Sequence, residues 1–349
     1  MVDFKYGNLL DADVEAIVNT VNTVGVMGKG IALQFRKAFP DNYAAYRRAV
    51  NHGEVQLGKM FVFERAELIG PHLIINFPTK AHWKAKSRLE DIQKGLDDLI
   101  ATIRRYQIGS IAIPPLGCGS GGLRWSDVGP LIEKAALALP DVSFWIYPPQ
   151  KAPAPEAMKI ASERPHWTAA RAALLGVLEG YCVPGYRLSM LEVQKLVYFL
   201  QVVGEPMDLH FVKAKYGPYA ENLNHLMQLL DGHLIKGYGD RSREASIQLI
   251  PDAVVEAKSI LQSSEETRAR LKKVSEFIEG FETPYGLELL SSVHWVAQED
   301  PQVKMTHEAA VRRLHEWNEH KRKTFRPEHI EIAWNRLREY GWLEIHGAA

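Results

Sequence analysis

Two glycine-rich segments and one lysine are the residues of this chain whose types and spacing suggest chemistry. The stretch PPLGCGSGGL, residues 114–123, places four glycines within six positions after an apolar run. Glycine lets backbone N–H groups approach a diphosphate closely. The stretch also fits G-x-G-x-x-G, but it comes too late for the opening turn of a dinucleotide-binding domain, and no Gly-Lys-Ser/Thr follows as in a P-loop. We expect a diphosphate cradle outside both of these nucleotide folds.

The other glycine-rich segment follows two asparagines, with NTVN at residues 19–22 and GVMGKG at residues 25–30. Asparagine side chains both donate and accept hydrogen bonds, which suits ribose hydroxyls. Glycines before a helix N-terminus suit an oxyanion. An ordinary connection from a strand to a helix contains the same residue types, so this segment alone leaves both interpretations open.

Lys80 ends an apolar strand-like run and begins the basic stretch KAHWKAK, residues 80–86. A lysine becomes a nucleophile when loss of water lowers its pKa from about 10.4. Most loop lysines are solvated, however, and a basic run with one aromatic residue is also typical of an ordinary surface. The stretch is therefore a candidate catalytic segment, and an ordinary solvated surface is the alternative.

The elements that must position these residues alternate between strands and helices over residues 1–149. We expect strands at 14–21, 60–63, 73–77, 111–113 and 142–147, and a helix at 30–39. Ser87 and Glu90 suggest a capping box before a helix through residue 103, and Ser126 suggests a cap on the next helix. This interleaving indicates an α/β domain with its sheet between helices.

A proline- and alanine-rich stretch at residues 150–165 indicates a linker. The pattern of residues 166–349 is mainly helical, with helices expected at 188–201, 220–230, 253–261, 265–281, 308–321 and 325–341. A small β-wing is expected at 342–345.

Composition excludes several classes of protein. Lys+Arg and Asp+Glu both total 42, so no overall basic surplus indicates nucleic acid. The chain has two cysteines and no CxxC, and His315 and His320 are five apart where a zinc-binding helix needs four. We expect no metal and no cofactor. The N-terminus does not resemble a signal peptide and no apolar run spans a bilayer, so we expect a cytoplasmic protein with no membrane partner.

In combination, GNLL, AIVNTVN, GVMGKGIALQF, NFPTK and IAIPPLGCGSGGLRW resemble the macrodomain family over residues 1–149. They look most like its lysine-dependent ADP-ribosyl hydrolases of the DarG type, antitoxins that remove the ADP-ribose that DarT-like toxins attach to thymine in single-stranded DNA. The resemblance implies that Lys80 and Asn22 are the catalytic residues, with Asn22 holding the distal ribose. It also implies ADP-ribose contacts from Asn8, Leu9, Asn19, Gly28, Lys29, Gly30, Ile31, Gly117, Cys118, Gly119, Ser120, Gly121, Gly122, Leu123 and Tyr147.

The sequence departs from the family pattern at two positions. Many macrodomains have Gly-Asp where this chain has Gly7-Asn8, which affects the adenine side. Relatives that cleave protein carboxylate esters carry an acidic residue near Gly121, and this chain does not. A different leaving group is therefore expected. An aromatic beside cations suits an unstacked base and its phosphates, so we expect a DNA-facing rim of His82, Trp83, Lys84 and Lys86.

Residues 191–201 and 211–219, LEVQKLVYFLQ and FVKAKYGPY, resemble Panacea-type antitoxin domains, which neutralise partner toxins. A plain helical domain is the alternative. The resemblance implies toxin contacts from Lys195, Tyr198, Tyr216, Gly217 and Pro218.

The leading hypothesis is an antitoxin with two activities. The first domain would remove ADP-ribose from DNA, and residues 166–349 would bind the cognate DarT-like toxin. A non-catalytic ADP-ribose reader and a protein ADP-ribose ester hydrolase are the rival hypotheses. Lys80 argues against the reader, and Gly121 against the ester hydrolase.

Overall fold

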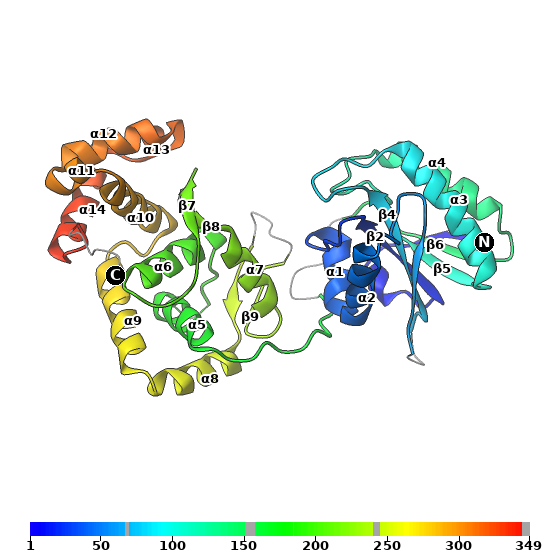
Figure 1. The fold of residues 1–349 in the computed structure, drawn as a ribbon, viewed down its shortest axis with the longest axis horizontal. Helices are drawn as coiled ribbons and strands as arrows, with labels where there is room; N and C mark the ends of the chain where they lie inside the picture. The colour runs from blue at the N-terminus through cyan, green and yellow to red at the C-terminus, as the bar shows by residue number, and fades with distance from the viewer. Residues whose placement is uncertain (67–69, 151–157, 184, 240–244, 344–349) are drawn as a thin grey trace. The chain divides into compact units, whose positions relative to one another are not determined.

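The computed structural model describes residues 1–66, 70–150, 158–183, 185–239 and 245–343. The chain folds as two compact units, residues 1–163 and 164–349 (Figure 1). An α/β unit is followed by a mainly helical one, so the expected fold class is confirmed.

The first unit extends past residue 149 because part of the expected linker packs on it. The Lys159 ammonium lies 2.7 Å from the Asp11 carboxylate. The backbone N–H of Ala161 donates to the Lys37 carbonyl over 2.8 Å. The remainder of the expected linker, residues 151–157, lies outside the described residues.

A six-stranded sheet forms the centre of the first unit, in the order β1-β6-β5-β2-β4-β3. Every neighbouring pair is parallel except β3 with β4. All strands but β3 therefore end at the same edge. The strands are β1 (Val2–Phe4), β2 (Ala16–Asn22), β3 (Phe61–Glu64), β4 (Leu73–Lys80), β5 (Ser110–Ile113) and β6 (Ser143–Ile146).

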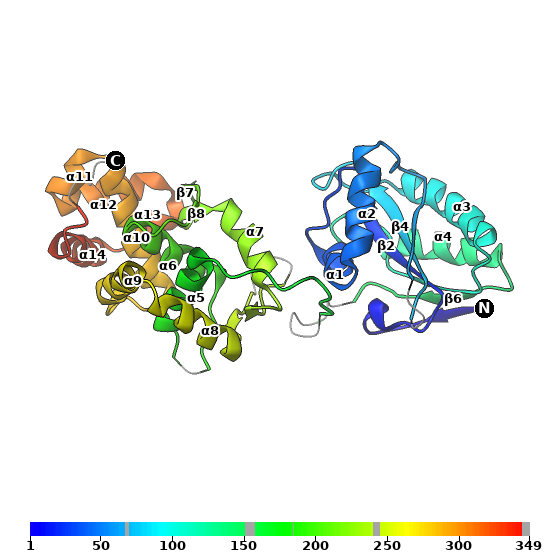
Figure 2. The same cartoon turned by 60° about the horizontal axis from the view of Figure 1, so that its bottom comes forward.

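Helices cover both faces of this sheet (Figures 1 and 2). Because successive strand residues point to opposite faces, Val18 of β2 packs in the core beneath α3 and α4, whereas Ile17 packs in the core with Phe35 of α1. The helices are α1 (Gly30–Ala38), α2 (Pro40–Asn51), α3 (Leu89–Arg105) and α4 (Trp125–Leu137), with a short 3₁₀ helix, η1 (Leu9–Asp11).

Both helix caps expected in this unit are wrong. Helix α3 begins after Arg88 and α4 after Arg124, and neither has a side-chain cap. Ser87 lies outside α3, and Ser126 lies within the first turn of α4. The sequence pattern also missed β1 and α2.

The second unit is built around α6 and α10, whose apolar residues lie in one continuous core. Ser189 and Glu192 form a complete capping box at the start of α6. The helices are α5 (Ala169–Tyr181), α6 (Met190–Val202), α7 (Glu221–Leu230), α8 (Pro251–Gln262), α9 (Glu265–Ile278), α10 (Pro284–Glu299), α11 (Pro301–Met305), α12 (His307–Trp317), α13 (Glu319–Thr324) and α14 (Pro327–Glu339).

Two small antiparallel sheets accompany these helices. One is the hairpin of β7 (Phe211–Ala214) and β8 (Gly217–Ala220), and the other pairs β9 (Ile235–Lys236) with β10 (Gln248–Leu249). The β-wing was expected at 342–345 instead. Residues 342 and 343 form a turn, and residues 344–345 lie outside the described part of the chain.

The helix expected at 308–321 is two helices. Asn318 adopts an extended backbone between α12 and α13, and its side chain accepts a hydrogen bond from Lys321 N over 2.8 Å. Asparagine favours such a cap over a helix interior because its side chain replaces a missing backbone partner.

Candidate active site

The parallel strands bring the sequence-predicted residues to one edge of the sheet. Asn22 ends β2 and Lys80 ends β4, and the two are paired across a bulge in the register. The glycine loop, residues 114–123, follows β5, and Tyr147 follows β6. Ligands of open α/β sheets bind in the crevice at this edge.

The Lys80 amine lies between two loops. Its Nζ donates to the carbonyl of Trp83 and to the carbonyl of Ser120, both over 3.2 Å. Partial burial lowers the pKa of Lys80 below its ordinary value of 10.5, because a charged amine loses solvation there. The arrangement favours a reactive amine over a solvated surface lysine.

The glycine loop folds back on itself. Leu123 N donates to the Gly117 carbonyl and Gly122 N to the Gly119 carbonyl, both over 3.0 Å. Gly117 and Gly122 have φ of +69° and +77°, which glycine adopts without strain. A side chain at Gly119 would point into open space. The loop therefore leaves room on the side of Gly119 for a bulky anion.

Ser87 joins this loop to the segment that follows Lys80. Its N–H donates to the Gly121 carbonyl over 3.0 Å, and its buried Oγ meets no hydrogen-bond partner among the described residues. A Cβ on Gly121 would lie 2.2 Å from Ser87 Oγ and 2.4 Å from the Gly117 carbonyl oxygen. Only glycine therefore fits at position 121, because Ser87 packs directly against it. Sequence reasoning took it for a helix cap, and no local signal indicates this contact.

Cys118 lies in the same loop but is poorly suited to act as a nucleophile. Burial, and then the charge of Asp127, raise the pKa of its thiol to about 11. The thiolate is the reactive form of cysteine. Lys80 is therefore the better candidate among the reactive side chains of these two loops.

Asn22 shapes the loop before α1. Its Oδ1 accepts from Val24 N over 3.0 Å and from Val26 N over 3.3 Å, and its Nδ2 donates to the Val26 carbonyl over 2.6 Å. The Tyr46 hydroxyl donates to the Asn22 backbone carbonyl. The loop continues through the half-buried Gly28 and the exposed Lys29 to Gly30, with φ of +57°, and Ile31.

Asn19 does not belong to the ligand-facing surface, which corrects its assignment as an ADP-ribose contact. Its side chain is 0% exposed, and its Nδ2 donates to Asn76 Oδ1 over 2.9 Å. Asn76 in turn donates to Asn42 Oδ1 over 2.7 Å. The three amides bind β2, β4 and α2 together, which is a structural role.

The expected adenine side combines η1 with the end of β6. Asn8 caps η1, its side chain accepting from Leu10 N over 3.1 Å. Leu9 and Tyr147 are both buried in the core that contains Phe35. Burial, and then Asp11, raise the pKa of Tyr147. Asn8 is more exposed than the other two expected contacts here, Leu9 and Tyr147.

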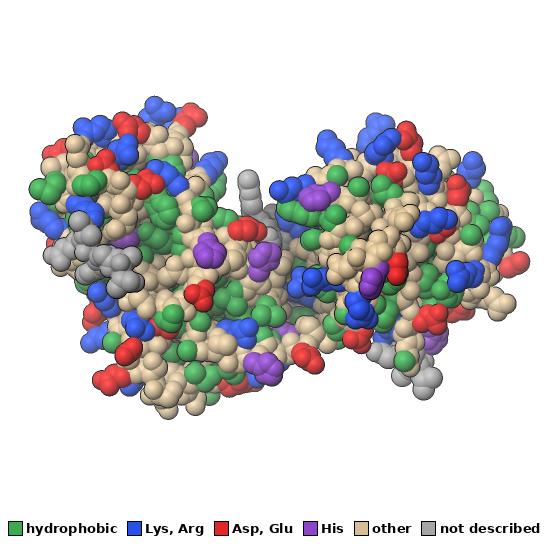
Figure 3. Space-filling model, in the orientation of Figure 1, with side chains coloured by type: hydrophobic (Ala, Val, Ile, Leu, Met, Phe, Trp, Pro, Cys, Tyr) green, Lys and Arg blue, Asp and Glu red, His purple; other side chains and the backbone are tan. Residues whose placement is uncertain are grey.

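The expected DNA rim is on the surface beside Lys80. Trp83 is 49% exposed, its ring lies 5.5 Å from that of His82, and the Lys84 ammonium lies 4.8 Å above it. Lys86 is also exposed. Figure 3 shows Lys and Arg interspersed with Asp and Glu on the visible face of each unit, so this rim is a local feature.

Four of the five residues expected to contact a toxin are buried, which corrects that assignment. Lys195 is 2% exposed and donates to the Pro218 carbonyl over 2.5 Å. The Tyr198 hydroxyl lies 2.7 Å from His294 Nδ1, and Gly217 is buried against Ser292. Tyr216 is 41% exposed and remains available to a partner.

His315 and His320 contact separate groups, the Phe325 carbonyl and the Glu288 carboxylate. Throughout the described ranges, no three His, Cys, Asp or Glu side chains are placed to share a metal ion. None of the helices in those ranges has the length and apolar character needed to cross a membrane.

Comparison with known proteins defines the class first. The Macro domain family model matches residues 18–132, which include most of β2, Lys80 and the glycine loop, so the first unit is a macrodomain. Over 98% of its length the chain is 45% identical to a DNA ADP-ribosyl glycohydrolase of Thermus aquaticus, 94% of which is covered. The chain belongs to this family of DNA ADP-ribosyl glycohydrolases, and the resemblance identified in the sequence is confirmed.

Two further relatives match part of the chain. A DNA ADP-ribosyl transferase–DNA ADP-ribosyl glycohydrolase fusion protein of Thermosipho africanus is 34% identical over 41% of this chain and 40% of its own length. The structure of the macrodomain of Mycobacterium tuberculosis DarG is 55% identical and covers 43% of this chain and 99% of that one, with a TM-score of 0.43.

Proposed function

We propose that the chain hydrolyses the bond between ADP-ribose and thymine in single-stranded DNA, with Lys80 as the catalytic residue. The observation that carries this proposal is the partly desolvated Lys80 amine, held by two carbonyls between two loops. The Thermus aquaticus relative, which aligns along nearly the whole chain, is named a DNA ADP-ribosyl glycohydrolase, and this supports DNA as the carrier of the ADP-ribose.

The hydrogen bonds of Lys80 suit a nucleophile. A neutral amine has two N–H bonds and one lone pair, and the carbonyls of Trp83 and Ser120 accept the two N–H bonds. The lone pair then attacks the anomeric carbon of the distal ribose. When the new C–N bond forms, thymine leaves and takes the proton that the amine loses. Water then releases ADP-ribose and restores the amine.

The remaining groups at this edge would hold the substrate. The backbone N–H groups around Gly119 and at the start of α1 suit the diphosphate. Asn22 would position the distal ribose by exchanging its loop contacts for ribose hydroxyls. The exposed ring of Trp83 and the nearby Lys84 suit a flanking base and its phosphate.

The two rival functions fit the site less well. A reader that only binds ADP-ribose needs no amine between the two loops. A protein ester hydrolase with an acidic residue at Gly121 would place a side chain where Ser87 and the Gly117 carbonyl already lie. The site therefore favours hydrolysis with a leaving group other than a carboxylate.

The test of this proposal compares Lys80 variants on two substrates, ADP-ribosylated single-stranded DNA and ADP-ribosylated protein. We expect the wild type to release ADP-ribose from the DNA only. Lys80→Ala should abolish release while ADP-ribose still binds. Lys80→Arg keeps hydrogen-bond donors but is always charged, so it should also be inactive. Near wild-type turnover by Lys80→Ala would rule out the catalytic assignment.

A matched control comes from the same unit. Lys134 is an exposed lysine on α4, away from the loops of the site, so Lys134→Ala should hydrolyse the DNA substrate at the wild-type rate. Equal losses in the Lys80 and Lys134 variants would indicate damage to the fold.

We also propose that residues 164–349 bind and inhibit a DNA ADP-ribosyltransferase of the DarT type. This unit has a core of its own and contains neither the glycine loops nor Lys80. The Thermosipho africanus relative is named as a fusion of a transferase and a glycohydrolase in one chain, which supports a functional pair. A binder would prevent new modification while the macrodomain removes what has formed.

A further inference from the structure

We propose that a hollow in the second unit, between the β7–β8 hairpin and the junction of α12 with α13, binds single-stranded nucleic acid. Phosphates would contact its lysines, and bases its aromatic rings. The proposal rests on the proposed function for the identity of the strand as DNA. The hollow has a volume of about 570 Å³, and its walls include Lys213, Lys215, Trp317, Asn318, His320 and Lys323.

Cations and aromatic rings alternate around this hollow. The Lys213 ammonium lies 4.7 Å from the centre of the Trp317 ring, and the Lys215 ammonium lies 5.1 Å from that of Tyr216. Tyr216 is at the tip of the hairpin, with its ring 4.9 Å from that of His320. Grooves that bind single strands combine cations for the backbone with rings for the bases.

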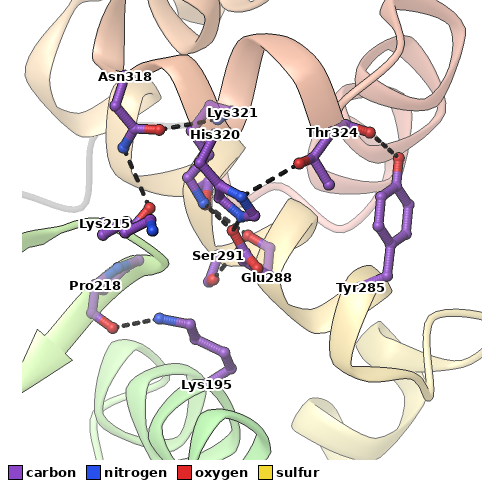
Figure 4. Close-up of polar contacts among 11 residues, drawn as sticks. Lys195, Lys215, Pro218, Tyr285, Glu288, Ser291, Asn318, His320, Lys321 and Thr324 are labelled. Atoms are coloured by element: carbon purple, nitrogen blue, oxygen red, sulfur yellow. Dashed lines mark hydrogen bonds and ion pairs between the residues drawn. The ribbon is translucent and has the colours of Figure 1, made fainter.

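The walls of the hollow are joined to each other. Figure 4 shows Asn318 pointing toward Lys215, and its Nδ2 donates to the Lys215 carbonyl over 3.2 Å. Behind the hairpin, a Cβ on Gly217 would lie 2.9 Å from Ser292 Oγ. The hairpin is therefore held against α10 and the α12–α13 junction, so the hollow exists before a ligand binds.

Buried lysines lie beneath the hollow. Lys321 Nζ contacts Glu288 Oε1 over 2.5 Å, and His320 Nε2 contacts the same oxygen over 3.0 Å (Figure 4). Lys195 is the second buried amine. Burial lowers the pKa of both amines, and the negative charge of Glu288 raises the pKa of both against the effect of burial. A phosphate in the hollow would favour their protonated forms.

A nucleic acid fits this combination better than an acidic protein segment. Ion pairs already occupy part of the cationic lining, since Lys213 contacts Glu299 over 2.5 Å and Lys323 contacts Glu319 over 2.6 Å. A ligand that used charge alone would have to compete with these pairs. Every nucleobase, in contrast, has a face that stacks on Trp317 or Tyr216 in addition to its phosphate.

The test measures binding of a fluorescent, unmodified oligothymidine to the full chain by anisotropy over a range of salt concentrations. We expect Lys215→Glu with Lys323→Glu to weaken binding and to reduce the slope of log K against log salt by about 1.4, or about 0.7 for each lost phosphate contact. Tyr216→Ala should weaken binding at least about fivefold with little change in slope, because it removes stacking.

The matched control is Lys272→Glu. Lys272, like Lys323, is an exposed lysine in an i,i+4 pair, here with Glu276 on α9, and it should bind the oligonucleotide as the wild type does. Wild-type binding by the double variant, or an equal loss in Lys272→Glu, would overturn the proposal. Loss of toxin co-purification with unchanged oligonucleotide binding would also overturn it, and would identify the hollow as a protein contact.

A further substrate separates this proposal from the proposed function. Hydrolysis of ADP-ribosylated thymidine, which has no flanking strand, should be the same in the wild type and in the double variant. If the wild type does not release ADP-ribose from ADP-ribosylated single-stranded DNA while the oligonucleotide result holds, the proposed function fails and the hollow remains.

Discussion

Gly119 and Gly121 lie two residues apart in the glycine loop, and each requires glycine for a different reason. At Gly121 the neighbouring Ser87 and Gly117 leave no room for a Cβ. At Gly119 the space is open, and the proposed occupant is the diphosphate itself. The first glycine serves the fold of the loop, and the second serves its ligand.

Substitution at Gly119 separates these roles. Gly119→Ala adds a methyl group in open space and should leave the loop intact. Gly119→Glu should abolish ADP-ribose binding, because its carboxylate enters the proposed diphosphate position and repels it. Calorimetric titration with ADP-ribose measures the effect. Unchanged affinity in the glutamate variant would show that the diphosphate binds elsewhere.

Lys195 gives a prediction for pH. Burial, with Lys321 as a further cause and Glu288 opposing, lowers the pKa of Lys195 from 10.5 to about 7. Between these values the unfolded chain holds a proton that the folded chain has released, so the free energy of unfolding contributed by this group rises with pH. Urea unfolding of the second unit should therefore show a smaller rise from about pH 7 to pH 10 in Lys195→Met than in the wild type. An identical rise would mean that Lys195 titrates normally.

At the residue scale, the sequence indicated Lys80 and the glycine loop because strand ends and glycine spacing are local properties. It misassigned Asn19, Tyr198 and Lys195 because burial depends on partners distant in sequence. Asn76 accepts a hydrogen bond from Asn19, His294 contacts Tyr198, and the Pro218 carbonyl accepts a hydrogen bond from Lys195. Ser87 was missed as a site residue for the same reason.

At the scale of elements, β4 determines where Lys80 lies, and α3 packs closely on β4. A Cβ on Gly95 of α3 would lie 2.2 Å from the ring of Phe77. Glycine thus allows the helix to approach the strand that ends in the catalytic candidate.

Gly95→Ala should destabilise the first unit by about 1–3 kcal/mol, since extra volume in a packed core forces side chains and backbone to shift. A thermal melt of the full chain measures the effect. The contrasting variant is Gly180→Ala in α5, where a Cβ meets nothing within 4 Å and helix propensity alone should stabilise the second unit. Equal stability of Gly95→Ala and the wild type would show that α3 moves without cost.

Most elements of the first unit were predictable from apolar periodicity. In the second unit, α5, the central α10 and the short α11 were not expected. Helix α2 was missed because PDNYAAYRRAVN lacks a regular apolar stripe, although Tyr46 and Ala49 are buried. Strand β1 has three residues, too few for a pattern. The break at Asn318 was missed because the residues on both sides suit one helix.

At the scale of the whole molecule, the division into two units predicts separable activities. Residues 164–349 alone should bind the transferase toxin and inhibit it near one fragment per toxin, because binding uses up the inhibitor whereas hydrolysis does not. Toxin activity on DNA, titrated with the fragment, measures the ratio. Full-length Lys80→Ala should inhibit equally well. A folded fragment that neither binds nor inhibits the toxin would leave the second unit without this role.

The bonds that join Ser87 to Gly121 and Lys80 to Ser120 connect the proposed diphosphate loop to the catalytic amine. A shift of the loop on binding must therefore change the position of the amine, and the two events share a coupling free energy. This coupling is reciprocal. If protonation of Lys80 alters the affinity of the loop for ADP-ribose, bound ADP-ribose alters the proton affinity of Lys80 by the same factor. Bound product would then change the proton affinity of the amine, and the state of the enzyme between turnovers would depend on how fast ADP-ribose leaves.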